Sequence, residues 1–532
     1  PISDNISYLC EKHNTNHNLM KSSIHAIMLT IGLIAPTAAN ADTVTMRMSD
    51  INPKTVIMPE IYGQFAEHLG SCIYGGLWVG PDSPIPNTSG YRNDVLQALR
   101  DLKVPVMRWP GGCFADEYHW RDGIGPAKDR PTQVNNNWGG TVEDNSFGTH
   151  EFFNLCELIG CEPYLSGNVG SGSVEELAQW VEYITAAEGP MARLRKENGR
   201  EKPWKLKYLG VGNESWGCGG NFTPDYYANV YRRYQTYCRN FSDNRLYKIA
   251  SGASDYDYDW TDVVMKNAHS HMDGISLHYY TVAGWNGSKG SATDFTPEDY
   301  YWTMGKCLEI EPVIEKHAAI MDKYDAKKRI GLLVDEWGTW WDVEPGTNPG
   351  HLYQQNTMRD AMVAALSLNV FQRHADRVKM ANIAQVANVL QSMVLTRGDK
   401  MVLTPTYYVF KMYTPHQGAT PIPLDVATSS MRVRDNRHID MLQATASQKD
   451  GRIAVSLTNL SLDTPMEVKI PTDGKARDIQ GSILSAASID DYNDFGQPEK
   501  VTLRPFDGAK SGKNAIKMTL PAKSIVTITF AL

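Results

Sequence analysis

Short apolar runs alternate with amphipathic stretches along the chain from about residue 60 to residue 415. The amphipathic stretches repeat their apolar positions at helical spacing and predict helices at residues 93–103, 174–187, 224–240 and 355–374. The apolar runs predict buried strands at residues 61–66, 104–109, 162–167, 206–212, 247–251, 274–278, 330–335 and 379–386. Eight strands separated by helical segments predict an α/β fold, a (β/α)8 barrel.

The pattern changes after about residue 416. Ile516, Met518 and Leu520 alternate with polar residues, as do the apolar residues between Val526 and Phe530. This period of two, interrupted by turn-rich segments, predicts a C-terminal antiparallel β-sandwich. We therefore expect an upstream extension and signal peptide at 1–41, a strand segment at 42–62 that pairs with the sandwich, a catalytic barrel at 63–415 and the β-sandwich at 416–532.

The N-terminal segment has the pattern of a signal peptide. Lys21 precedes an apolar run at residues 24–35, and Ala39-Asn40-Ala41 matches the small-residue pattern of a cleavage site. The apolar run is shorter than the roughly 20 residues that span a bilayer. We expect cleavage near Ala41 and export to the periplasm or the cell exterior, with no membrane segment in the mature form.

Charge and cysteine content narrow the function classes. The net charge is −8 and no stripe of Lys and Arg is present, so nucleic acid is excluded as a partner. One of the 8 cysteines, Cys10, lies in the extension. The seven that remain are an odd number, so at least one thiol is free, metal-bound or paired with another molecule.

Two glutamates follow predicted barrel strands. One strand leads into Asn213-Glu214 and another into Asp335-Glu336-Trp337, each with further tryptophans nearby. Barrel enzymes carry their catalytic groups at the carboxyl ends of the strands. Two carboxylates at that position suit glycoside hydrolysis, in which one protonates the leaving oxygen and the other attacks the anomeric carbon or activates water.

The order of motifs resembles glycoside hydrolase family 51, the α-L-arabinofuranosidases, over nearly the whole chain after residue 41. The resemblance implies a (β/α)8 barrel with a C-terminal β-sandwich and exo-acting removal of arabinofuranose with retained configuration. The matching stretches are Phe65-Ala-Glu-His-Leu-Gly70, Arg108-Trp-Pro-Gly-Gly-Cys-Phe114, Gly212-Asn-Glu-Ser-Trp-Gly217, Ile275-Ser-Leu-His-Tyr-Tyr280, Asp335-Glu-Trp337 and Ala381-Asn-Ile-Ala-Gln385.

The resemblance also assigns roles to individual residues. It implies that Glu214 is the general acid/base, that Glu336 is the nucleophile and that Asn213 bonds the sugar 2-hydroxyl. Glu67 and Arg108 match residues that hold the furanose and orient the carboxylates. The remaining expected substrate contacts are Cys113, His278, Tyr280 (Tyr279 being the alternative), Trp337 and Gln385.

Cys113 departs from the family pattern, because many members place Asn after the Pro-Gly-Gly. A thiol cannot replace the two-sided hydrogen bonding of an amide. Cys72 and Cys218 follow two other motifs and are expected at the same end of the barrel. The three cysteines have three interpretations: small buried side chains, a disulfide plus a free thiol, or a soft-metal site.

No other motif points to a cofactor or a metal. Residues 167–172 form a glycine-rich loop without the order of a dinucleotide-binding fingerprint, and we interpret them as a barrel loop. The expected partner is an arabinofuranosyl-containing oligo- or polysaccharide, and the family resemblance is compatible with a homo-oligomer. Two alternatives remain: an endo-β-glucanase or xylanase on the same barrel, and a non-catalytic carbohydrate-binding protein.

Overall fold

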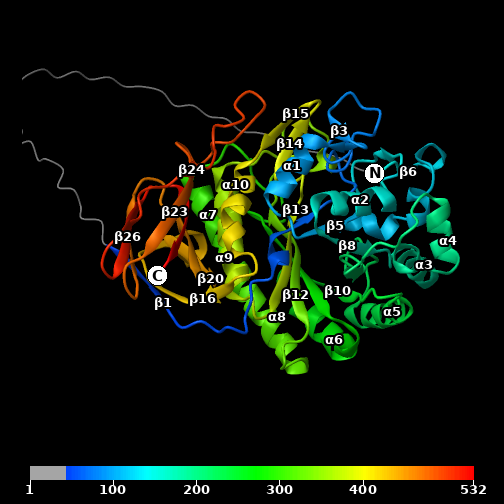
Figure 1. Cartoon of the computed structure of the whole chain (residues 1–532), viewed down its shortest axis with the longest axis horizontal. Helices are drawn as coiled ribbons and strands as arrows, with labels where there is room; N and C mark the ends of the chain where they lie inside the picture. Colours follow the sequence, from blue (N-terminus) through cyan, green and yellow to red (C-terminus); the bar gives the residue numbers. More distant parts are fainter. Residues whose placement is uncertain (1–42) are drawn as a thin grey trace, which may run out of the picture. The chain divides into compact units, whose positions relative to one another are not determined.

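Eight parallel strands close into a barrel in the computed structural model, which describes residues 43–532 (Figure 1). The predicted signal peptide lies outside the described residues. The order around the barrel is β10-β11-β12-β13-β2-β5-β8-β9, which is the chain order of a (β/α)8 fold and confirms the predicted fold class. The strands are β2 (Gly63–Phe65), β5 (Val106–Trp109), β8 (Glu162–Gly167), β9 (Tyr208–Val211), β10 (Tyr247–Ser254), β11 (Gly274–Thr281), β12 (Gly331–Thr339) and β13 (Val378–Ala384).

Helices connect the strands, and local capping fixes where several of them begin. The hydroxyl of Ser173 accepts from the Glu176 N–H while the Glu176 carboxylate reaches back, and the Thr357–Asp360 pair makes the same reciprocal contact. The helices are α1 (Asn93–Asp101), α2 (Thr149–Ile159), α3 (Val174–Thr185), α4 (Pro190–Glu197), α5 (Pro224–Tyr237), α6 (Tyr258–Ala268), α7 (Pro297–Leu308), α8 (Ile310–Tyr324), α9 (Met358–Arg373) and α10 (Pro405–Tyr413).

A β-sandwich follows the barrel. One sheet has the order β17-β1-β22-β26-β25 and the other the order β16-β20-β21-β27-β23-β24. Most neighbours are antiparallel, but β1 pairs in parallel with β22 and so brings the N-terminal strand into the sandwich. The strands are β1 (Val44–Met48), β16 (Thr420–Ile422), β17 (Leu424–Ala427), β20 (Leu442–Lys449), β21 (Arg452–Asn459), β22 (Met466–Pro471), β23 (Arg477–Ser485), β24 (Arg504–Pro505), β25 (Lys510–Ser511), β26 (Ala515–Leu520) and β27 (Ser524–Ala531).

Short hairpins and 3-10 turns complete the fold. Within residues 43–532, no helix combines the length and the apolar character needed to cross a membrane. The hairpins pair β3 (Asn87–Thr88) with β4 (Tyr91–Arg92), β6 (Gln133–Val134) with β7 (Val142–Glu143), β14 (Val394–Arg397) with β15 (Lys400–Leu403), and β18 (Ser430–Arg432) with β19 (His438–Asp440).

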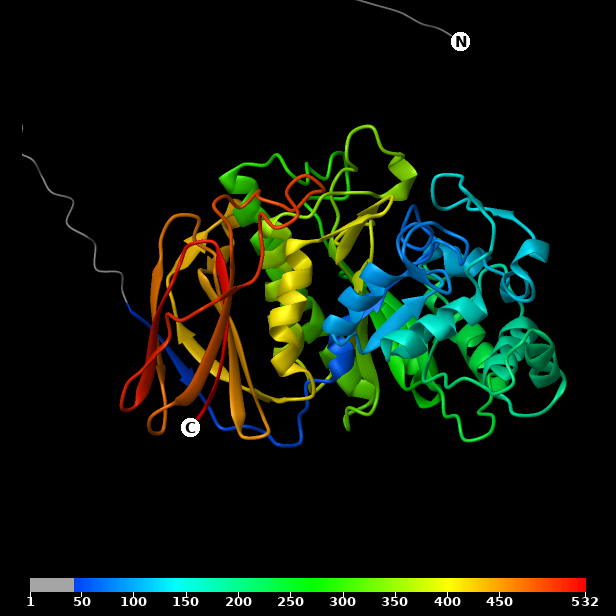
Figure 2. The ribbon, with the colours of Figure 1, turned by 45° about the horizontal axis from the view of Figure 1, so that its top comes forward.

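Helix α9 lies between the barrel and the sandwich (Figure 2). It contacts β12 and β13 on one side and β20 and β21 on the other, and every residue from Met358 to Gln372 is buried. A helix that is covered on all faces needs apolar residues all round, and a partner for each polar one. Gln372 has such partners on both sides, because its amide donates to the Tyr62 hydroxyl (2.8 Å) and accepts from the Thr445 hydroxyl (3.0 Å).

Replacement of Gln372 by Ala should therefore weaken the contact between barrel and sandwich. The change leaves two buried hydroxyls without a partner, at about 1–3 kcal/mol for each unsatisfied group. We expect a loss of at least about 2 kcal/mol in the free energy of unfolding, measured by denaturant titration. Gln97→Ala on the exposed face of α1 is the control and should change this quantity by less than about 0.5 kcal/mol. Equal effects of the two changes would contradict the assignment.

Candidate active site

A bulge in β12 brings two consecutive acidic residues to the same side of the strand. Against β11, Ser276 pairs with Leu333 and His278 with Glu336, so β12 holds one extra residue over this interval. The same extra residue appears against β13. Alternation would send Asp335 and Glu336 to opposite faces, but the bulge turns both toward the barrel interior.

Arg108 on β5 joins these acids to the loop after β9. Its guanidinium is buried and donates to Glu336 Oε1 (2.8 Å) and to Asn213 Oδ1 (2.6 Å), and it lies 3.7 Å from Asp335 Oδ2. The guanidinium also lies over the Phe65 ring, at 4.5 Å from its centroid. Arg108 thus fixes the Glu336 carboxylate and keeps a positive charge beside it.

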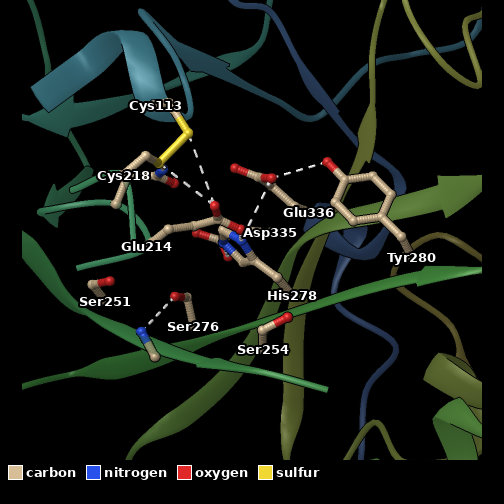
Figure 3. Close-up of polar contacts among 12 residues, drawn as sticks. Cys113, Glu214, Cys218, Ser251, Ser254, Ser276, His278, Tyr280, Asp335 and Glu336 are labelled. Atoms are coloured by element: carbon tan, nitrogen blue, oxygen red, sulfur yellow. Dashed lines mark hydrogen bonds and ion pairs between the residues drawn. A yellow bond between two sulfur atoms is a disulfide. The ribbon is translucent and has the colours of Figure 1, made fainter. Parts of the chain in front are cut away.

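His278 on β11 lies between three carboxylates, and we call Glu214, His278, Asp335 and Glu336 the charged cluster (Figure 3). Its Nδ1 is 2.8 Å from Glu214 Oε1 and 3.5 Å from Glu336 Oε2, and its Nε2 is 3.2 Å from Asp335 Oδ1. Burial lowers the pKa of His278, but the facing carboxylates, Glu336 first, raise it to about 10. His278 is therefore an imidazolium that donates at both nitrogens.

The spacing of the charged cluster also bears on metal binding. Ligand atoms of Glu214, His278 and Glu336 all lie within 4.8 Å of one another, which is close enough to surround a cation. A histidine binds metals only in its neutral form, and here both nitrogens of His278 face carboxylates that favour the protonated ring. The chemistry of this donor set therefore fits a network of ion pairs among protein groups better than a metal site.

Glu214 stands on a tight turn just past the end of β9, and its side chain is 20% exposed. One of its carboxylate oxygens lies within 4.8 Å of one from Glu336. Burial raises the pKa of Glu214, the hydrogen bond from His278 lowers it, and the charge of Glu336 raises it; the net direction is upward. Glu214 is thereby held in its protonated form to higher pH than an ordinary glutamate.

Tyr280 on β11 completes the surroundings of Glu336. Its hydroxyl donates to Glu336 Oε2 at 2.9 Å, so the two oxygens of Glu336 are bonded by Tyr280 and Arg108 respectively. The neighbouring Tyr279 points elsewhere, because its hydroxyl bonds the carbonyl oxygen of Lys306. Of the two tyrosines considered, Tyr280 is the one in contact with the predicted nucleophile.

Glu67, just after β2, is bonded from three separate segments. Its Oε1 accepts from the Phe114 N–H (3.1 Å) and the Trp138 indole (2.9 Å), and its Oε2 accepts from the Gln385 amide (2.9 Å). Burial and the charge of Glu336 raise the pKa of Glu67 to about 7. The structure thus brings Glu67 and Gln385 together, with Trp138 as a neighbour that the sequence did not indicate.

Two of the three cysteines near the barrel mouth form a disulfide. Cys113 is bonded to Cys218, and their sulfurs lie 3.9 and 3.6 Å from Glu214 Oε2 (Figure 3). Neither sulfur carries a proton, so these are van der Waals contacts. Cys72 is a buried free thiol whose pKa burial raises to about 12. The disulfide interpretation therefore holds for this trio, and Cys113 contributes a disulfide sulfur where the resemblance led us to expect a sugar-binding side chain.

Trp337 does not reach the charged cluster. The bulge sends it to the outer face of β12, where its buried ring packs against Phe371 of α9 and Phe410 of α10. The aromatic residues beside Tyr280 are instead Trp340 and Trp285, with ring centroids 5.1 and 6.5 Å from that of Tyr280. Trp285 is 50% exposed and therefore available to a ligand.

Three buried polar residues of the site were not identified as functional candidates from the sequence. Asp335 was visible only as the neighbour of Glu336. Tyr164 donates to Asp335 Oδ2 (2.6 Å), and Asp116 accepts from the Asn213 N–H (3.1 Å). A useful signal is an acidic residue shortly after a strand end, as at Asp116, which follows the Pro-Gly-Gly motif after β5.

Paired carboxylates at the carboxyl ends of two strands of a (β/α)8 barrel, here β9 and β12, are the arrangement of a glycoside hydrolase. The profile described as "Alpha-L-arabinofuranosidase 1 domain" matches residues 98–294, and the "Alpha-L-arabinofuranosidase C-terminal domain" matches residues 335–524. The chain is 67% identical to an "Intracellular exo-alpha-L-arabinofuranosidase" of Bacteroides ovatus, over 89% of this chain and 93% of that protein. The chain belongs to glycoside hydrolase family 51, the retaining α-L-arabinofuranosidases, as the motif order predicted.

Solved structures agree with this family. The family 51 arabinofuranosidase of Xanthomonas axonopodis pv. citri has a TM-score of 0.89 and 49% identity, with 92% of this chain and 100% of that chain covered. The α-L-arabinofuranosidase of Thermotoga maritima, solved as an arabinose complex, has a TM-score of 0.79 and 28% identity at the same coverage.

The prediction of export is wrong. It rested on residues 1–41, which lie outside the described residues, and on their similarity to a signal peptide. The Bacteroides ovatus relative matches 89% of this chain at 67% identity, and its name describes it as "intracellular". A basic residue, a short apolar run and an Ala-x-Ala sequence were too weak a pattern to assign a signal peptide.

The electrostatics of the charged cluster can be tested by removing its histidine. His278→Asn deletes a positive charge 2.8 Å from Glu214, so the pKa of Glu214 should rise further, by about 1–3 units. The measurement is a carbon-13 NMR titration of glutamate carboxyls, with Glu214 assigned from the spectrum of Glu214→Gln. His416→Asn is the control, because burial lowers the pKa of His416 to about 3 and leaves it neutral. An unchanged or lower pKa of Glu214 would contradict the charge we assign to His278.

Proposed function

We propose that this enzyme releases terminal α-L-arabinofuranose from arabinan, arabinoxylan or arabino-oligosaccharides, with Glu336 as nucleophile and Glu214 as acid/base. The spacing of the two carboxylates carries the proposal. Their nearest oxygens lie within 4.8 Å, near the roughly 5–5.5 Å separation of retaining enzymes and short of the roughly 6.5–9.5 Å that admits a water in inverting ones. Their environments differ in the required sense, since Glu336 is bonded by Arg108 whereas burial raises the pKa of Glu214.

In the first step, Glu336 attacks the anomeric carbon and the glycosidic C–O bond breaks. Glu214 gives its proton to the departing oxygen, so the alcohol leaves neutral and the sugar becomes an ester of Glu336. The hydrogen bonds from Arg108 and Tyr280 orient the Glu336 carboxylate for this attack. Asn213, held by Arg108 at 2.6 Å, is the proposed partner of the sugar 2-hydroxyl.

In the second step, water replaces the leaving group. Once Glu336 is esterified its negative charge is gone, and Glu214, now a carboxylate beside the imidazolium of His278, takes a proton from the water. The water oxygen bonds to the anomeric carbon and the ester C–O bond breaks, which restores Glu336. Two displacements at one carbon retain the configuration.

The Glu67 carboxylate is held by hydrogen bonds from three separate segments of the chain, through Phe114, Trp138 and Gln385. We propose that Glu67 and Gln385 hold the hydroxyls of the furanose. Trp285 and Trp340 have ring centroids 5.6 Å apart and line the side of Tyr280, where they can stack on the sugar that leaves.

The substrate class can be tested with purified enzyme on 4-nitrophenyl α-L-arabinofuranoside, β-D-xyloside and β-D-cellobioside. We expect turnover of the arabinofuranoside, NMR detection of the retained anomer as first product, and arabinose alone from arabinan and arabinoxylan oligosaccharides. Shortening of the polymer backbone would favour the endo-glucanase or xylanase alternative. Absence of all turnover would favour a carbohydrate-binding protein.

Removal of each of the two carboxylates should have a different effect on activity and on the product formed with azide. Glu336→Ala should lose nearly all activity on every substrate, and azide, attacking from the opposite face, should give an inverted product. Glu214→Ala should lose most activity on natural glycosides but keep much of kcat/KM on substrates with activated leaving groups, which need no acid. Azide should restore its turnover with retained configuration.

Glu162→Ala is the matched control for both variants. Glu162 begins β8 at the amino-terminal end of the barrel, and its replacement should leave activity near that of the wild type. Retained azide product from Glu336→Ala together with inverted product from Glu214→Ala would reverse the assignment. An inverted sugar from the wild type would exclude double displacement.

A further inference from the structure

The acid/base stands on a backbone turn that needs external support. Strand β9 ends at Val211, Gly212 has a φ of 92° and Glu214 has a φ of 39°. A positive φ suits Gly212, but for Glu214 it is a left-handed conformation that non-glycine residues adopt at a cost. Such a conformation persists where surrounding contacts hold it, so the groups that bond this turn control where the Glu214 carboxylate lies.

Contacts within the turn hold its far end. The carbonyl oxygen of Glu214 accepts from the N–H groups of Gly217 (2.7 Å) and Gly219 (3.1 Å). A Cβ on Gly219 would lie 1.8 Å from the carbonyl oxygen of Asn213 and 2.8 Å from Asp116 Oδ2, so the return of the chain at this point requires glycine.

Two side chains from other segments hold the near end. Asp116 Oδ2 accepts from the Asn213 N–H at 3.1 Å, and the Ser251 hydroxyl of β10 accepts from the Ser215 N–H at 3.2 Å (Figure 3 labels Ser251). These contacts fall on the residues that directly precede and follow Glu214. Ser251 therefore holds the peptide unit that follows Glu214, and Asp116 holds the peptide unit that leads into Asn213.

Asp116 also ties this turn to the loop after β8. It lies in the 3-10 turn Cys113–Glu117 after β5 and is 2% exposed. Its Oδ1 accepts from the N–H groups of Val169 (2.8 Å) and Gly170 (2.9 Å). One carboxylate thus joins the loops that follow three neighbouring strands, β5, β8 and β9.

The bonding pattern requires an acceptor at both oxygens of Asp116. Three backbone N–H groups point at it, and a donor at either oxygen would face one of them. Burial raises the pKa of Asp116 to about 7, while the three N–H groups and Arg108 lower it. Asp116 takes part in no chemical step of the mechanism proposed above. Burial of a carboxylate costs free energy, so its presence here needs another explanation.

We propose that Asp116 is a positioning residue for the acid/base: through the Asn213 N–H it holds the turn that aims Glu214 at the leaving oxygen. This inference rests on the proposed role of Glu214. Asn213 itself has a second anchor in Arg108, at 2.6 Å from its Oδ1, so loss of Asp116 should disturb the sugar contact less than the proton transfer.

Asp116→Asn tests the inference with a nearly isosteric change. The Asn oxygen can still accept from Val169 and Gly170, but its NH2 group then faces the Asn213 N–H, donor against donor. We expect kcat/KM for an alkyl arabinofuranoside or an arabino-oligosaccharide to fall roughly 30-fold or more, since misplacement by about 1 Å can cost about 100-fold. For a 2,4-dinitrophenyl arabinofuranoside, whose leaving group needs no acid, kcat/KM should fall no more than about 3-fold. Azide should raise kcat on that substrate.

Asp325→Asn is the matched structural control. Asp325 is also a buried carboxylate that accepts from a backbone N–H, that of Ile330 at 2.6 Å, but it lies before β12 at the amino-terminal end of the barrel. Any loss of activity in this variant should be equal for good and poor leaving groups. If Asp116→Asn behaves the same way, Asp116 is structural and the inference is overturned.

Ser251→Ala serves if Asp116→Asn fails to fold. It removes the other side-chain support of the turn without adding a donor, and it should show the same dependence on the leaving group at a smaller magnitude. A loss that is uniform across leaving groups would overturn the inference. Failure of the proposed function would look different, because Glu214→Ala would then show neither sensitivity to the leaving group nor azide rescue.

Discussion

The site depends on the burial of Arg108 among acidic groups. Its guanidinium contacts Glu336, Asn213 and Asp335, which come from two separate segments of the chain. Buried carboxylates are tolerable only when they are paired and hydrogen-bonded. Arg108 and the imidazolium of His278 supply two positive charges, which balance Asp335 and Glu336. Burial raises the pKa of Glu214, the hydrogen bond from His278 lowers it and the charge of Glu336 raises it, with a net upward direction. The environment of Glu214 therefore favours the protonated form that its proposed role as acid requires.

The backbone makes this balance geometrically possible. Without the extra residue in β12, Asp335 and Glu336 could not both face Arg108 and His278. The same bulge fills the outer face of the strand with Trp337, which packs on α9 and α10. The catalytic arrangement and the packing between barrel and helices thus depend on the same local irregularity.

Much of this could be predicted from the sequence, because apolar runs and motif order are local signals. The strand predicted at 162–167 matches β8 residue for residue, and all eight predicted strands overlap the observed ones. The bulge leaves no such signal, so Trp337 was assigned to the substrate and Asp335 was given no role. The pairing of Cys113 with Cys218 also depends on which loops meet, and the sequence left three interpretations open. The position of Asp116 after a strand end marks it as a candidate, but the side chain accepts from backbone N–H groups only, and the sequence does not show which loops supply them.

Retaining catalysis asks one carboxyl group to give a proton and then to take one from the same direction. The contacts of Glu214 suit both of these proposed tasks. His278 lies between Glu214 and Asp335 and is hydrogen-bonded to both. The two disulfide sulfurs lie in van der Waals contact with the other oxygen of Glu214, at 3.6 and 3.9 Å. In the proposed mechanism, esterification of Glu336 removes the negative charge that raised the pKa of Glu214, while the imidazolium that lowers it remains. The pKa of Glu214 then falls between the two steps, which accounts for its proposed change from acid to base.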